Sequence, residues 1–190
     1  MLLENLNERI AKLPAERRAK GVVVVMHTMG SHGPAYFKRV PEAFKKFTPV
    51  CASNALPDCQ REEVVNAYDN TIAYTDHFLA STVKWLKTQS NAAHTAMIYI
   101  SDHGESLGEN NLYLHGLPYA MAPDVQKRVP WITWLSDDYA RRTRLDIGCL
   151  KAATDTRVSH DTLFHSVLGL MDVQTSVNQR KADIYAPCVK

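Results

Sequence analysis

Acidic and imidazole side chains follow a predicted strand in the segment SDHGESLGE, residues 101–109. Asp102 and His103 come directly after a β-branched and aromatic run, and Gly104 lets the backbone turn sharply behind them. A carboxylate oxygen and an imidazole nitrogen are both good zinc ligands. The pair alone fits either an Asp–His turn held only by hydrogen bonds or part of a metal site, and it does not decide between them.

Two further histidines, His32 and His115, each lie next to a glycine, in SHGP (31–34) and LHG (114–116). Taken singly, a histidine of this kind is more often a capping or surface residue. Glu105 and Glu109 either support a metal-bound histidine through a hydrogen bond or are solvated loop acids, which are the commoner case. Four ligand-type residues in two loops favour a shared site, provided that the fold brings the loops together.

Hydrophobic periodicity predicts the elements that must position these loops. We expect buried strands over 21–28, 95–101 and 129–136, and helices over 2–13, 61–87 and 159–172. Apolar strands separated by helices indicate an α/β fold, with a mostly parallel sheet and helices on both faces. Because ligands bind beyond the carboxyl ends of parallel strands, the loops 27–34 and 101–116 should meet at one edge of the sheet.

Composition narrows the class of protein. The 190 residues are 45% hydrophobic and 22% charged, which is typical of one globular domain. A net charge of +2 gives no argument for nucleic acid or an anionic membrane surface as partner. No run approaches the roughly 18 apolar residues of a transmembrane helix, and residues 1–20 do not have the pattern of an export signal.

Four cysteines are unevenly placed. Cys51 and Cys59 bracket the short polar segment CASNALPDC. They are either a disulfide, which requires an oxidising compartment, or two free thiols. The state of Cys149 and Cys188 stays open.

Four segments together resemble a known family: HTMGSHGPAYFKR (27–39), AYDNTIAYTD (67–76), SDHGESLGENNLYLHG (101–116) and HDTLFHSVLGLMDV (160–173). They are similar to the catalytic domain of lipid A phosphoethanolamine transferases. This family includes the mobile colistin-resistance enzymes and belongs to the alkaline phosphatase/sulfatase superfamily. The resemblance runs through most of the chain.

The resemblance implies roles residue by residue. Asp102 and His103 match zinc ligands, and His32 and His115 match histidines that bind the phosphate group or a second zinc. Cys51 and Cys59 match a disulfide of the periplasmic domain. The implied reaction moves phosphoethanolamine from phosphatidylethanolamine to a lipid A phosphate through a phosphoenzyme, at the periplasmic face of the inner membrane. The added amine lowers the negative charge that attracts polymyxins.

Parts of the family pattern match no position in this sequence. These are the transmembrane domain and the first part of the catalytic domain, with its nucleophilic threonine and a further acidic zinc ligand. Thr28 and Ser31 lie at a different motif position and are not candidates for the nucleophile. We therefore expect residues 1–190 to be the C-terminal portion of the catalytic domain, inactive alone and of marginal stability. The alternatives are a sulfatase-like phosphodiesterase that hydrolyses its substrate and a non-catalytic remnant.

Overall fold

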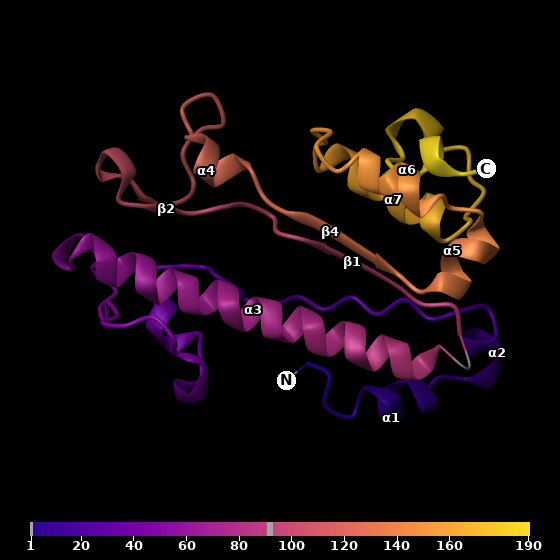
Figure 1. Cartoon of the computed structure of the whole chain (residues 1–190), viewed down its shortest axis with the longest axis horizontal. Helices are drawn as coiled ribbons and strands as arrows, with labels where there is room; N and C mark the ends of the chain where they lie inside the picture. The colour runs from indigo at the N-terminus through magenta and orange to yellow at the C-terminus, as the bar shows by residue number, and fades with distance from the viewer. Residues whose placement is uncertain (1, 91–92) are drawn as a thin grey trace. The chain divides into compact units, whose positions relative to one another are not determined.

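The computed structural model describes residues 2–90 and 93–190. The chain divides into two compact units, one of Met1–Leu86 with Tyr99–Trp131 and one of Lys87–Ile98 with Ile132–Lys190. The helices and strands, drawn in Figure 1, are α1 (Leu6–Ala11), α2 (Ala15–Arg18), α3 (Arg61–Gln89), β1 (Ala96–Ile100), β2 (Ser106–Leu107), β3 (Tyr113–Leu114), α4 (Asp124–Lys127), β4 (Trp131–Leu135), α5 (Asp137–Thr143), α6 (Ile147–Ala152) and α7 (Asp161–Leu170).

Helix α3 is the longest element and confirms the helix predicted over 61–87. Its buried residues include Val64, Ala67 and Thr71, which recur at three- and four-residue steps and so lie on one face. Glutamates in its first turn and Lys87 in its last turn suit the two ends of the helix dipole. No helix among the described residues is both long and apolar enough to cross a membrane.

The strands come in two pairs. β1 pairs with β4, and both lie within the ranges predicted from the sequence. β2 and β3 form a short antiparallel hairpin in which Ser106 is opposite Leu114. This register places the residues just outside the hairpin, Glu105 and His115, near each other.

The buried strand predicted over 21–28 is wrong. The structure has an extended trace there without strand pairing, the indigo segment of Figure 1. Its valines are exposed, and Val25 reaches 88%. A β-branched run becomes a buried strand only beside a partner that takes up its backbone hydrogen bonds and covers its side chains. No strand in the described ranges pairs with this segment.

Each unit has its own core and its own disulfide. The first core gathers around Tyr36, Cys51 and Val64, and the second around Leu145 and Tyr185. The expected bond between Cys51 and Cys59 is confirmed, with the two Cα atoms 5.7 Å apart. Cys149 and Cys188, which the sequence left open, form a second disulfide with a Cα separation of 5.5 Å.

Candidate functional site

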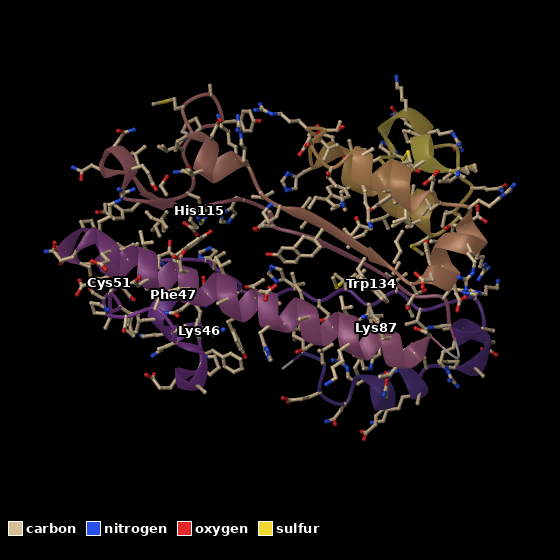
Figure 2. The ribbon with its side chains drawn as sticks, viewed as in Figure 1. Lys46, Phe47, Cys51, Lys87, His115 and Trp134 are labelled. Carbon is tan, nitrogen blue, oxygen red and sulfur yellow. A yellow bond between two sulfur atoms is a disulfide. The ribbon has the colours of Figure 1, made fainter. Side chains whose placement is uncertain are left out.

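Three histidines that the sequence placed in two separate loops meet in the first unit. One nitrogen each of His32, His103 and His115 lies within 4.8 Å of the others. The rings of His103 and His115 are stacked with centroids 3.6 Å apart, and the His32 ring is 5.0 Å from that of His115. His32 is exposed and the other two are half-buried, so the group is open to solvent. Figure 2 labels His115.

The Nδ1 atom of each ring faces an oxygen that can only accept a hydrogen bond. For His32 it is the Gly33 carbonyl at 2.6 Å, and for His103 it is the Gly104 carbonyl at 3.0 Å. For His115 it is the Glu105 carboxylate, 3.2 Å from Nδ1. An Nδ1 that donates to such an oxygen carries the ring proton and leaves the Nε2 lone pair free. All three rings are therefore oriented to offer Nε2 as a ligand.

Glu105 ties the two histidine loops together. Only 7% of the residue is exposed, and its Oε1 accepts the Gly33 N–H at 3.1 Å as well as facing His115. The commoner interpretation of Glu105 from the sequence, as a solvated loop acid, is therefore wrong. The loops do meet as predicted, but the contact that joins them is a buried carboxylate rather than two neighbouring strands.

The loop that carries His103 is braced against α4. The Gly104 N–H donates to the Gln126 carbonyl at 3.0 Å, and Gln126 Nε2 donates to the buried Ser106 hydroxyl at 2.8 Å. A Cβ atom at Gly104 would collide with the Val125 carbonyl. Glycine is thus required here for a close backbone approach, as well as for the turn inferred from the sequence.

Leu114 helps to aim His115. Its φ of 64° is in the left-handed region, which bulky residues rarely adopt. The conformation turns the chain at the end of β3, while the Leu114 side chain packs against the first core. Core packing therefore holds a strained backbone next to a site residue.

Asp102 lies beside the three histidines without joining the group. Its side chain is 82% exposed, and its Oδ2 is 3.8 Å from His103 Nε2. Its Oδ1 accepts the His103 N–H at 3.1 Å. Two ligands about 2.1 Å from a tetrahedral zinc are about 3.4 Å apart, so Asp102 and His103 stand near the separation that a shared cation requires.

Glu109 and Tyr36 are polar residues near the three histidines that form no hydrogen bond with them in the described part of the chain. Glu109 accepts the Leu107 N–H at 2.7 Å and lies 3.6 Å from the Arg61 guanidinium, so it serves the hairpin and not the histidines. Burial, and then the charge of Glu105, raises the pKa of Tyr36 far above its usual range. No sequence pattern pointed to a site role for Tyr36, because a tyrosine beside a glycine-proline turn is typical of a core residue.

Residues 2–173 match the sulfatase family. The chain belongs to this family. It is 50% identical over 167 residues to the phosphoethanolamine transferase EptA of Salmonella typhimurium, covering 87% of this chain and 30% of that protein. It is 47% identical over 159 residues to the phosphatidylethanolamine transferase Mcr-1 of Escherichia coli, covering 84% and 28%. The chain thus spans about a third of the length of these relatives.

Solved structures agree with the sequence relatives. The soluble domain of lipooligosaccharide phosphoethanolamine transferase A from Neisseria meningitidis superposes with a TM-score of 0.91 at 40% identity, covering all of this chain and 55% of that one. The C-terminal periplasmic domain of phosphoethanolamine transferase EptC from Campylobacter jejuni gives 0.85 at 41% identity, covering 100% and 58%. The family resemblance and the α/β, sulfatase-like fold expected from the sequence are confirmed.

Proposed function

We propose that this chain serves the transfer of phosphoethanolamine from phosphatidylethanolamine to a lipid A phosphate. Its site would bind zinc through Asp102 and His103, beside His32 and His115. The observation that carries the proposal is the convergence of three imidazole nitrogens within 4.8 Å beside a carboxylate. The names of the relatives, phosphoethanolamine and phosphatidylethanolamine transferases, supply the substrate class.

The donor set suits zinc better than harder cations. Zinc binds imidazole nitrogen and carboxylate oxygen, whereas magnesium and calcium prefer oxygen ligands alone. All four cysteines are in disulfides, so no thiolate competes for the metal. A neutral ring that donates from Nδ1 in these contacts presents the Nε2 lone pair, which is the form that a metal requires.

Each residue has a part in this proposal. Asp102 and His103 hold the metal, and His32 and His115 hold the phosphate oxygens of the substrate or a second zinc. Bound zinc would neutralise the phosphodiester charge that repels an attacking oxygen. His32 and His115 face the same space from a second loop and can donate to the oxygens on which charge develops.

The covalent step lies outside these residues. In the family pattern the phosphoenzyme forms on a threonine, and no position of this sequence matches it. We therefore expect no transfer by the 190 residues alone, and we expect transfer when they act together with a segment that supplies the threonine.

The disulfides favour the periplasmic face of the inner membrane as the location. Disulfides persist in oxidising compartments such as the periplasm and are rare in the cytosol. Two solved neighbours are described as a periplasmic domain and an integral membrane protein. A phosphoethanolamine group would add a positive amine to lipid A, and weaker binding of cationic polymyxins should follow.

A chimaera tests the function in a complete enzyme. The 190 residues would replace the matching segment of Mcr-1, and lipid A would be analysed by mass spectrometry. We expect lipid A that carries phosphoethanolamine, and its loss in a His103→Ala chimaera present at the same level in the membrane. Release of free phosphoethanolamine without modified lipid A would instead support the phosphodiesterase. A well-expressed chimaera without either product would contradict the proposal.

A further inference from the structure

Glu105 is a buried acid whose carboxylate contacts both histidine loops. Its side chain is 3% exposed, compared with 30% for that of His115. A buried carboxylate is costly unless its oxygens are paired. Oε1 has two partners, the Gly33 N–H at 3.1 Å and His115 Nδ1 at 3.2 Å. Burying this carboxylate lowers the stability of the fold, so we expect a role of Glu105 other than packing.

The second oxygen of Glu105 and the hydroxyl of Tyr36 are both buried polar atoms. Neither has a standard hydrogen-bond partner among the described residues. The two groups nevertheless interact, because the Glu105 charge is among the causes that raise the pKa of Tyr36. The phenol therefore keeps its proton and can turn it towards the carboxylate.

We propose that Glu105 is a positioning residue that fixes the His115 ring with its proton on Nδ1 and locks it to the loop of His32. Hydrogen bonding of one ring nitrogen to a carboxylate selects the tautomer and strengthens the other nitrogen as a ligand. The neutral side chain of a histidine in water prefers its proton on Nε2, so this ring is held in the less favoured form. Tyr36, a buried core residue that keeps its proton under the influence of the Glu105 charge, supports the arrangement from within the core.

The connection to Gly33 gives Glu105 a second task. Gly33 directly follows His32, and its N–H has the same Oε1 as acceptor that faces His115. One oxygen therefore sets the distance between two histidines that lie 83 positions apart in the chain. A cation or phosphate held between them would meet ligands whose spacing is preset.

The proposal rests on the site proposed above, so the first test does not use the metal. In the metal-free chain labelled with ¹⁵N, the His115 resonances can be assigned by their loss in His115→Gln. In the neutral ring, at a pH above its titration, we expect the Nε2 signal of an unprotonated nitrogen. A neutral His115 ring with its proton on Nε2 would overturn the proposal without any further variant.

Variants of the two loop acids supply the matched comparison. Glu105→Gln keeps the shape but removes the charge, and Glu109→Gln alters an acid of the same loop that touches no histidine of the site. We expect Glu105→Gln to give a mixture of His115 tautomers and to weaken zinc binding about 10- to 100-fold, and Glu109→Gln to change neither. Equal effects of the two variants, both folded, would contradict a positioning role.

The outcomes separate this proposal from the function proposed above. If the wild-type chain binds no zinc and the His115 tautomer still depends on Glu105, the positioning role stands and the metal site falls. If zinc binds and the tautomer is indifferent to Glu105, the metal site stands and the positioning role falls.

Discussion

At the scale of single residues, the site is set by contacts to backbone and by one buried acid. His32 and His103 each direct Nδ1 to the carbonyl of the following residue, Gly33 and Gly104. Each of these contacts joins neighbouring residues, so it does not depend on distant parts of the fold. His115 instead depends on Glu105, a side chain ten positions away, and so on the β2–β3 hairpin.

Gly33 is a crowded position next to a site histidine. A Cβ atom there would lie 2.7 Å from the Tyr36 hydroxyl and would overlap a methyl group of Leu114. We expect Gly33→Ala to lower the free energy of unfolding by about 1–3 kcal/mol, because overpacking forces neighbours to shift. Chemical denaturation measures the change, and an unaltered midpoint would show that the neighbours yield freely.

Asp183 provides a pH test far from the histidines in sequence. Burial raises the pKa of its carboxyl, although hydrogen bonds from the Tyr185 and Ala186 N–H groups and the nearby Arg180 and His165 oppose the shift. The folded state therefore binds the proton more tightly, and the stability that the protonated acid contributes is lost as pH rises through the folded pKa.

For Asp183→Asn we expect little change in the melting temperature near pH 3, where the native acid is also neutral. The variant should gain on the wild type as pH rises towards neutrality, because asparagine stays uncharged. Melting temperatures at several pH values measure this difference. A difference that is constant with pH would contradict a raised pKa.

At the scale of elements, short helices depend on their caps. Ser136 caps α5: its side chain accepts the Tyr139 N–H and also the Thr95 N–H, each at 3.2 Å. The residue is buried, so both donors would lose their partner together if the hydroxyl were removed. The N-cap residue of α7, His160, makes no side-chain cap bond, and the exposed Ser159 before it accepts the Asp161 N–H at 3.2 Å.

Ser136→Ala should cost about 2 kcal/mol of unfolding free energy, near the upper end for a capping residue, because two backbone donors are left unpaired. Ser159→Ala is the matched control and should cost about 0.5 kcal/mol, since water can replace its exposed hydroxyl. Denaturant unfolding of both variants gives the comparison. Equal losses would show that the bond to Thr95 adds nothing.

Elements with strong local patterns could be predicted from the sequence, and those that depend on distant partners could not. α3 and α7 follow from periodicity, and β1 and β4 from apolar runs bounded by turns. The valine run at 22–25 has the same local pattern as a strand but lies exposed without strand pairing. Local pattern reports a preference for extended backbone, whereas pairing depends on residues elsewhere.

For the candidate site, the sequence predicted the histidines but not the buried residues that hold them. Histidines beside glycines in two loops were enough to predict that His32, His103 and His115 converge. The burial of Glu105 could not be predicted, because an acid in a glycine-rich loop is usually solvated and its partner Gly33 is 72 positions away. Tyr36 could not be predicted either, because a tyrosine at such a position is typical of a core residue.

At the scale of the whole molecule, each unit contains one disulfide, and the two disulfides close loops of different length. Cys51 and Cys59 are 8 positions apart, and Cys149 and Cys188 are 39 apart. Four valines at 22–25 and Met29 add exposed apolar surface in the first unit. The marginal stability expected from the sequence therefore stays a prediction, and the disulfides are the features that oppose it.

The longer disulfide loop should stabilise more. In the chain-entropy account, the 8-residue span contributes about 2.5 kcal/mol and the 39-residue span about 4 kcal/mol. We expect the Cys149→Ser, Cys188→Ser double variant to melt at a lower temperature than the Cys51→Ser, Cys59→Ser one. Calorimetry of the two proteins decides the order, and the reverse order would show that core packing outweighs chain entropy.

Zinc binding by the 190-residue chain tests the central claim most directly. Titration calorimetry would compare the wild type with Asp102→Ala, His103→Ala and with His94→Ala, an exposed histidine outside the group of three. We predict one zinc per chain, lost in the double variant and kept in His94→Ala. Absence of binding by the wild type, or equal binding by all three proteins, would contradict a metal site at Asp102 and His103.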